Sequence, residues 1–441
     1  MSDLISYTLN EIAEFSKGIS YSSSDYTENG TGITFITIKS ILKGGGYDKT
    51  GLKTIRNRFT QQDLLSEDDL LIAITDLTRD GDIVGSPIII PKHLVGSVAS
   101  MDLVRIILNE SITCTRYLYY FLMLPSTRRY FVNHSSGSTV LHLETKSIPK
   151  LTIPLLSLDD QKRVVKILST VDEVIEKTEA AIDKYQAIKA GMMQDLFTRG
   201  IDTQTGKLRP TIEEAPELYK ESELGWIPKE WDVTDFDDVI KEYFDFRGKT
   251  PLKLGMNWGG GSIKAISANN IEPGFINFNK EHYLASEDLY RAWMNHGDCS
   301  KGDVVMTSEA PLGVVAQIPD NNKYILSQRV FLFKVKPSSI TNDYLYYLMN
   351  TDRFQNDLQR QSSGSTVTGI QQARLARIRM QLTRSLEEQL HISKILKSID
   401  LGISDNKEML SKYKNLKHGL MADLLTGKVR VNLNDNKVEK G

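Results

Sequence analysis

The chain has 441 residues, of which 40% are hydrophobic and 25% charged, and its formal net charge is −2 at pH 7. This length is typical of a globular protein with two or three cores and excludes a single small domain. The near-neutral charge argues against a free-standing nucleic-acid-binding domain, because such domains are usually basic. Cys114 and Cys299 lie far apart without metal-ligand spacing, so neither a disulfide framework nor a metal site is expected. The sequence shows no basic leader and no run of about 18 apolar residues, which predicts a cytoplasmic protein.

Residues 1–155 mix short β-type runs, such as ITFITI and GSPIII, with polar turns. This mixture predicts an α/β or α+β domain. The aromatic segment YLYYFLM at Tyr117–Met123 is expected to form a helix that packs on the sheet, with its tyrosines in the core rather than stacked on bases.

Residues 156–200 carry apolar side chains at alternating steps of four and three, which is the spacing of a coiled-coil seam. We predict one helix of about 40 residues and about 60 Å, since the rise is about 1.5 Å per residue. Lys189 and Thr178 are polar positions in its seam, and Gly200 permits a left-handed cap. Its apolar seam residues are Val164, Leu168, Val171, Ile175, Ile182 and Tyr185. Residues 201–228 are polar and interrupted by prolines, which indicates a linker.

The second half of the chain repeats the first. A shift of 228 positions aligns Ser157–Gly200 with Ser385–Lys428, with 16 identities in 44 positions. At a shift of 227 the string SSGSTV occurs at both Ser135–Val140 and Ser362–Val367, and further upstream the shift drifts to 230. The layout is therefore a variable unit, a matched helix, a linker, a second variable unit and a second matched helix.

The second variable unit, residues 229–383, again combines β-type runs with an aromatic helix, YLYYLM at Tyr344–Met349. The second matched helix spans residues 384–428 and is followed by a polar tail at 429–441. Its seam is Ile392, Leu396, Ile399, Ile403, Leu410 and Tyr413. Packing inside one domain would explain either stripe alone, but two matching helices can cover each other as an antiparallel pair. Asn406 would then lie near Thr178 and fix the register.

Candidate DNA contacts come from polar loops, because Asn, Arg, Lys, Ser and Thr are the residues that bond bases and phosphates. For the loops at Lys39 and Asn269 an Asx-rich turn is an equal alternative, and a tight structural turn explains the SSGST loops as well. The candidates are Lys17, Lys39, Ser40, Arg79, Ser136, Ser138, Thr139, Arg247, Lys249, Asn269, Asn270, Arg329, Ser363, Ser365 and Thr366.

Sequence motifs for catalysis are missing. The chain contains no GxxxxGK[ST] phosphate loop, no HExxH or GxSxG, and no pair of adjacent prolines that could form a methyltransferase PPY box. Glu144-Thr145-Lys146 matches half of a nuclease motif, but three common residues match by accident frequently. We expect no catalytic residue and no bound cofactor in this chain.

The repeat layout, the helix endings MMQDLFTRG and GLMADLLTGKVR, and the segment ELGWIPKEW at Glu223–Trp231 resemble the specificity subunits of type I restriction-modification enzymes. The resemblance covers nearly the whole chain. It implies that residues 1–155 and 229–383 are target recognition domains, each reading one half of an asymmetric, bipartite double-stranded DNA target.

The resemblance further implies that the helices set the gap between the halves and dock two methyltransferase subunits. Motor-nuclease restriction subunits would join this complex, and S-adenosylmethionine, ATP and Mg would belong to the partners. Two alternatives remain: a coiled-coil scaffold that binds no DNA, and a fragment of a fused restriction-methylation enzyme, which would need the catalytic motifs that are missing here.

Overall fold

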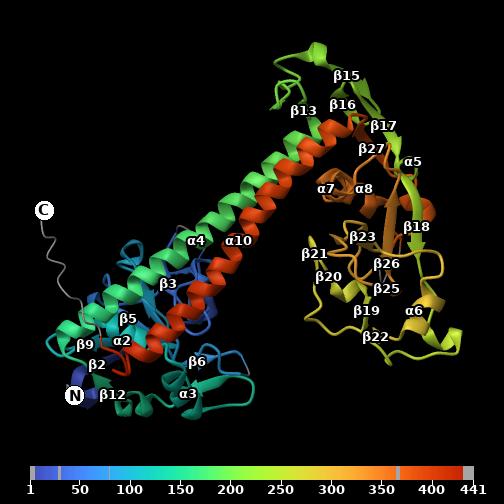
Figure 1. Ribbon diagram of the computed structural model, residues 1–441. Helices are drawn as coiled ribbons and strands as arrows, with labels where there is room; N and C mark the ends of the chain where they lie inside the picture. Colours follow the sequence, from blue (N-terminus) through green and yellow to red (C-terminus); the bar gives the residue numbers. More distant parts are fainter. Residues whose placement is uncertain (1–4, 28–30, 79, 364–367, 431–441) are drawn as a thin grey trace, which may run out of the picture. The chain divides into compact units, whose positions relative to one another are not determined.

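The computed structural model describes residues 5–27, 31–78, 80–363 and 368–430. The chain forms two compact units. Unit 1 comprises Met1–Ala180 and Lys407–Gly441, and unit 2 comprises Ala181–Asn406. Two long helices, α4 (Leu158–Thr198) and α10 (Leu386–Leu424), contribute one part to each unit (Figure 1).

Unit 1 is built on a four-stranded antiparallel sheet with the order β2-β9-β5-β7. A second sheet has the order β4-β3-β8, in which β3 is antiparallel to β4 and parallel to β8. Two smaller ladders are β1-β12 and β10-β11-β6. The strands are β1 (Ile5–Thr8), β2 (Ala13–Lys17), β3 (Ile33–Ile36), β4 (Lys53–Ile55), β5 (Leu70–Ala73), β6 (Thr75–Asp76), β7 (Pro87–Ile89), β8 (Val98–Ala99), β9 (Leu103–Leu108), β10 (Ser135–Ser136), β11 (Leu141–Leu143) and β12 (Thr152–Leu155). The helices are α1 (Leu9–Ile12), α2 (Thr115–Leu122) and α3 (Pro125–Asn133).

Three of the four unit 1 ladders recur in unit 2 with the same strand order, and β20-β21 is an additional ladder there. Its four-stranded antiparallel sheet is β18-β26-β23-β24, its mixed sheet is β22-β19-β25, and β17 pairs with β27. The strands are β17 (Trp231–Asp235), β18 (Ile240–Asp245), β19 (Ile263–Ile266), β20 (Ile271–Glu272), β21 (Phe275–Ile276), β22 (Leu284–Ala285), β23 (Val304–Thr307), β24 (Val315–Gln317), β25 (Tyr324–Leu326), β26 (Val330–Val335) and β27 (Arg379–Thr383). The helices are α5 (Phe236–Val239), α6 (Glu287–Trp293), α7 (Asn342–Met349), α8 (Asp352–Gln361) and α9 (Gln372–Leu375).

Strand β5, in the middle of the four-stranded sheet of unit 1, separates two hydrophobic cores. All four residues of Leu70–Ala73 are buried, and because side chains alternate along a strand they enter different clusters. Leu70 and Ile72 face the core that holds α2, whereas Leu71 and Ala73 face the core under the mixed sheet. The expected α/β organisation with an internal repeat is therefore confirmed.

The aromatic helices pack as the sequence predicts. Tyr117 and Tyr120 of α2 are almost fully buried in the core of unit 1, and Tyr344 of α7 is fully buried in the core of unit 2. Their hydroxyls are buried with them, and burial raises the pKa of Tyr117 and of Tyr344 above the usual value. These rings therefore support the fold and are not available for stacking on bases.

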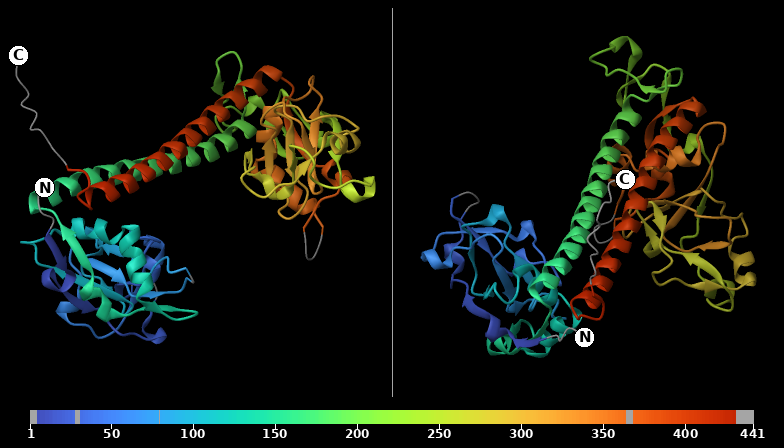
Figure 2. Two further views of the ribbon diagram at one scale, coloured as in Figure 1. Left: turned by 60° about the horizontal axis from the view of Figure 1, so that its bottom comes forward. Right: turned by 60° about the vertical axis from the view of Figure 1, so that its left-hand side comes forward.

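Helices α4 and α10 lie side by side and antiparallel within each unit (Figure 2). In unit 1, Lys417 pairs with Asp172 at 2.6 Å and Lys414 pairs with Glu179 at 2.7 Å, so positions ascend on one helix as they descend on the other. In unit 2, Lys189 pairs with Asp400 at 2.6 Å. The predicted antiparallel pair is confirmed.

The seam residues differ in burial. Six of them are buried, namely Val164, Leu168, Ile182, Ile392, Leu396 and Ile403, and five are half-buried, namely Val171, Ile175, Ile399, Leu410 and Tyr413. Tyr185 is 39% exposed. Its ring lies against Gly402, which has no side chain to cover it. Thr178 Oγ1 and Asn406 Nδ2 donate to carbonyls of their own helices at 2.7 Å, and their predicted proximity remains a prediction.

Residues 201–228 form two hairpins. One joins β13 (Ile201–Asp202) to β14 (Lys207–Leu208), and the other joins β15 (Tyr219–Ser222) to β16 (Gly225–Pro228). Gly200 precedes them at a φ of 67°, the left-handed conformation expected after α4. The segment predicted as a linker therefore has regular structure of its own.

Candidate nucleic-acid interface

Two arginines of unit 2 meet at one end of its central sheet. Arg247 follows β18, donates to the carbonyl of Ile370 at 3.0 Å and lies 4.9 Å from the centre of the Phe331 ring. Arg329 precedes β26 and pairs with Glu309 at 2.7 Å. The backbone of Ser308 links the two positions, since its N–H donates to the carbonyl of Arg329 and its carbonyl accepts from Ile370. The fold thus brings together two cations that are 82 positions apart in sequence.

Arg329 has an unusual backbone. Its φ of 69° lies in the left-handed region, which a residue with a side chain rarely adopts, and the side chain remains 56% exposed. Strained backbone held by its surroundings is concentrated at binding sites. The geometry presents the guanidinium to solvent beside Glu309, which keeps it oriented.

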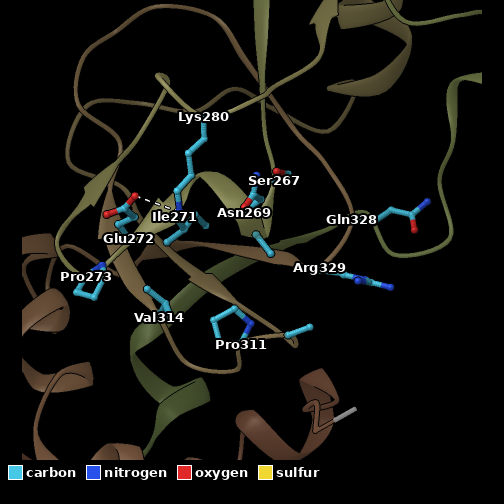
Figure 3. A pocket seen from close by; sticks show the side chains of 12 residues that line it. Ser267, Asn269, Ile271, Glu272, Pro273, Lys280, Pro311, Val314, Gln328 and Arg329 are labelled. Atoms are coloured by element: carbon cyan, nitrogen blue, oxygen red, sulfur yellow. Dashed lines mark ion pairs between the residues drawn. The ribbon is translucent and has the colours of Figure 1, made fainter. Parts of the chain in front are cut away.

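A surface cleft of about 580 Å³ joins Arg329 to Asn269 (Figure 3). Asn269 is exposed and follows strand β19 through a short 3-10 helix at Ala268–Asn270. Lys280 and Glu272 form an ion pair of 3.1 Å at the opposite side of the cleft. In Figure 3, Gln328 and Arg329 extend away from the ribbon on one side. Amide and guanidinium groups therefore line one hollow, the side chains best suited to bases.

Lys249 has a different environment. Its ammonium group donates to the carbonyls of Ala292 and Trp293, at 3.3 and 2.7 Å, and lies 5.5 Å from the centre of the Trp293 ring. Desolvation lowers the pKa of Lys249 below its usual value. Two of its donors are used on α6, so Lys249 has a structural role here, and its contact with DNA remains a prediction.

The loops aligned by the shift of 230 occupy equivalent places in the two domains. Ile38–Ser40 forms a 3-10 helix after β3, and Ala268–Asn270 forms one after β19. Ser40 and Asn270 are fully buried, and each side chain accepts a hydrogen bond from the backbone N–H three residues earlier. Lys39 is exposed. In each loop one candidate therefore faces solvent while the next one caps the turn, which favours the Asx-turn interpretation for the buried residue.

The described residues that flank the SSGST loops pair at equivalent places. Ser136 pairs with His142 in the β10-β11 ladder, and Ser363 pairs with Gly369 at the same place in unit 2. Gly137 has a φ of 130°, and a Cβ there would lie 1.9 Å from the carbonyl oxygen of Val140. The glycine is therefore required by the hairpin itself.

The remaining candidates stay separate. Lys17 is exposed at the end of β2, and Ser136, Ser138 and Thr139 are exposed in the hairpin loop of unit 1. Three further candidates lie outside the described residues: Arg79, Ser365 and Thr366.

Sequence reasoning missed the side chains that attach each helix to its domain. Gln161 and Gln389, both fully buried, occupy the same position in the repeat. The amide of Gln161 accepts from Thr113 Oγ1 at 2.9 Å and donates to the carbonyls of Ile112 and Leu156. Gln389 makes the corresponding bonds in unit 2. A glutamine identical in both repeats, in the strings SLDDQ and SLEEQ, was the available signal.

Within the described ranges, no group of three or more His, Cys, Asp and Glu side chains is placed to hold a metal ion. Among the same residues, no helix combines the length and apolar character needed to cross a bilayer.

The protein family described as "Type I restriction modification DNA specificity domain" matches residues 1–184 and 228–412. Because these ranges cover most of the sequence and include most of both repeats, the chain belongs to this family. Its function is that of a DNA-specificity subunit in a type I restriction-modification system.

Named relatives agree with this assignment. The type I restriction enzyme MjaVIII specificity subunit of Methanocaldococcus jannaschii is 27% identical over 397 residues, covering 88% of this chain and 86% of the relative. The EcoBI specificity subunit of Escherichia coli is 20% identical over 364 residues, covering 80% and 70%.

Solved structures share the fold. The S subunit of a type I restriction-modification system from M. genitalium superimposes with a TM-score of 0.58 at 12% identity and covers 95% of both chains. A chain from a structure on complex assembly and conformational transition of the type I R-M system gives a TM-score of 0.50 at 15% identity, covering 97% of this chain and 99% of that one.

Proposed function

We propose that each recognition domain binds one half of a split, asymmetric DNA target. The observation that carries this proposal is one topology used twice with different exposed side chains at equivalent places. Lys39 of unit 1 corresponds to Asn269 of unit 2, and Lys17 corresponds to Arg247. Two readers with the same fold but different surfaces bind different base sequences, because specificity comes from the side chains that reach base edges.

In unit 2, the face that reads DNA contains Asn269 and Arg329. Arginine pairs with guanine and asparagine with adenine through two hydrogen bonds each, and either pairing discriminates by about 1–3 kcal/mol. Arg247 lies beside them; its guanidinium is held by an ion pair with Asp245, remains partly exposed, and is assigned to a phosphate in this proposal. In unit 1, Lys17 and Lys39 take the corresponding roles.

Helices α4 and α10 serve as the spacer and as the docking surface for two methyltransferase subunits. Five large apolar side chains on these helices are more than 40% exposed, Leu390 of α10 among them at 57%, and such exposed groups favour contact with a partner protein. The other four are Ile188, Leu401, Met409 and Leu416. Motor-nuclease subunits would bind this complex, which would act on DNA in the cytoplasm.

The chain itself is non-catalytic in this proposal. S-adenosylmethionine would be bound by the methyltransferase subunits, while ATP and magnesium would be bound by the motor-nuclease subunits. The chain would select where the partners act.

The test is modified-base sequencing of DNA from cells that express this chain with its neighbouring methyltransferase. Methylation at one asymmetric split motif, absent when the methyltransferase is expressed alone, is the expected result. If the complex assembles and no new methylation appears, the proposal is wrong and a scaffold role becomes the better account.

Arg329→Ala tests the proposed reading face. Methylation should fall by about 10- to 100-fold, or spread to targets altered in one half-site, because one bidentate contact is lost. Lys323→Ala, which removes an exposed ion pair with Glu287 in the same unit, is the matched control and should leave the target unchanged. If both variants methylate the target equally, Arg329 does not contribute to reading the DNA sequence.

A further inference from the structure

A cluster of three polar side chains joins the unit 1 domain to both helices. Tyr120 of α2 donates its hydroxyl to Asp172 of α4 at 2.7 Å. Lys417 of α10 lies 2.6 Å from the other carboxylate oxygen of Asp172 and 5.5 Å from the centre of the Tyr120 ring. Three elements far apart in sequence therefore meet at one carboxylate.

Unit 2 contains the same cluster with the helices exchanged. Tyr347 of α7 donates to Asp400 of α10 at 2.9 Å, and Lys189 of α4 lies 2.6 Å from the second oxygen of Asp400. The distance from Lys189 to the centre of the Tyr347 ring is 5.6 Å. The two clusters agree in residue type, in bonding and in the cation over the ring.

The repeat retains this cluster but does not retain the neighbouring ion pair between the helices. Lys189 and Lys417 are related by the repeat shift of 228, as are Asp172 and Asp400. The neighbouring pair of Lys414 with Glu179 is not repeated, because the equivalent positions hold Gln186 and Lys407. Surface ion pairs thus differ between the repeats, whereas the tyrosine, aspartate and lysine are present in both.

The geometry makes each cluster sensitive to axial position. An apolar seam alone permits slippage by three or four residues, which is about 4.5–6 Å along a helix, whereas a polar contact specifies one register. The lysines are mostly shielded, with 13% of the Lys417 side chain and 28% of the Lys189 side chain exposed. A slip of 5 Å would separate each pair beyond hydrogen-bonding distance and leave these charges half-buried without partners.

The tyrosines connect that register to the recognition domains. Desolvation and the neighbouring carboxylates hold the pKa values of Tyr120 and Tyr347 far above the usual range, so both remain hydrogen-bond donors at neutral pH. Each domain is thereby attached to the same carboxylate that holds the opposite helix.

We propose that the clusters Tyr120–Asp172–Lys417 and Tyr347–Asp400–Lys189 are register locks that fix the number of base pairs between the two half-sites. Their members are positioning residues and do not touch DNA. This inference rests on the proposed function. A slip of about 5 Å corresponds to about 1.5 base pairs, since the rise of DNA is about 3.4 Å per base pair.

The test uses the full chain carrying Lys189→Met and Lys417→Met together, expressed with the methyltransferase. Modified-base sequencing then counts methylation at the two parental half-sites for every gap length. We expect methylation at the parental gap to fall several-fold and methylation at gaps one or two base pairs longer or shorter to rise to at least a tenth of the parental level. The pair Lys189→Arg and Lys417→Arg, which keeps both charges, should retain one gap.

Lys177→Met and Lys412→Met provide the matched control, because these lysines form exposed ion pairs within single helices. The gap between the half-sites that this control variant methylates should equal the parental gap. If the methionine variant does not assemble, Asp172→Asn with Asp400→Asn keeps the side-chain shape, removes both ion pairs between the helices and should broaden the gap in the same way.

An assembled variant that methylates less but at the parental gap alone would overturn the inference, since that result indicates a merely structural role. Loss of split-motif methylation in the assembled parental complex would instead overturn the proposed function, and the register locks with it.

Discussion

Glu388 is a buried carboxylate whose removal should destabilise unit 2 strongly. It is 1% exposed, forms an ion pair with Arg209, and accepts hydrogen bonds from the Ile201 N–H at 2.8 Å, Trp231 Nε1 at 3.1 Å and Thr383 Oγ1 at 2.6 Å. The β13–β14 hairpin, strand β17 and strand β27 all meet at this side chain at the start of α10. Glu388→Ala would leave a mostly buried guanidinium and three donors without their partner.

Breaking a buried ion pair from one side costs about 3–5 kcal/mol. With a urea dependence of about 2–3 kcal/mol/M, the unfolding midpoint of unit 2 should fall by about 1–2 M. Tryptophan fluorescence isolates this transition, because Trp226, Trp231, Trp258 and Trp293 all lie in unit 2.

Glu387→Ala is the control, since Glu387 is exposed one position earlier on the same helix. The urea midpoint of the Glu387→Ala variant should stay within about 0.2 M of the parental midpoint, as expected for a surface substitution. Glu388→Leu combined with Arg209→Met should recover part of the loss, because no charge then remains buried. A midpoint for Glu388→Ala as high as that of Glu387→Ala would refute the reasoning.

Three further outcomes are expected. A four-residue insertion in Val171–Tyr185, matched in Ile399–Tyr413, should lengthen the recognised gap in the methylation map and leave both half-sites unchanged; loss of a half-site would contradict the spacer role. Exchange of Met1–Lys150 for the same region of a relative should change one half-site, and a change in both would contradict two independent readers. Burial raises the pKa of the Cys299 thiol from its ordinary value near 9 to about 12, so its stabilising contribution is complete below pH 9 and is lost between pH 9 and 12. Between pH 8 and pH 10.5, the free energy of urea unfolding should therefore fall less for Cys299→Ala than for the parent. Equal decreases would show that ionisation of the Cys299 thiol does not affect stability.

The sequence alone determined the helices and the repeat. Seam positions such as Leu168 and Leu396 follow from a periodicity that is local to each helix, and the 228-residue shift needs no structure to be recognised. The resemblance to the family could also be recognised from the repeat layout, the helix endings and the segment ELGWIPKEW taken together. The order of the strands could not be predicted. Pairs such as β3 with β8 join segments more than 60 residues apart, and neither segment has a sequence feature that identifies its partner.

Only the tertiary structure decided which polar residues face solvent. Asn269 and Asn270 are chemically identical neighbours, yet the first is exposed and the second is buried as a turn cap. Lys189 looked like an interruption of the seam, but in three dimensions it meets Asp400 and Tyr347. The physical reason is that the role of a side chain depends on the residues it contacts, which come from distant parts of the chain. Helix periodicity, by contrast, depends only on residues close together in sequence.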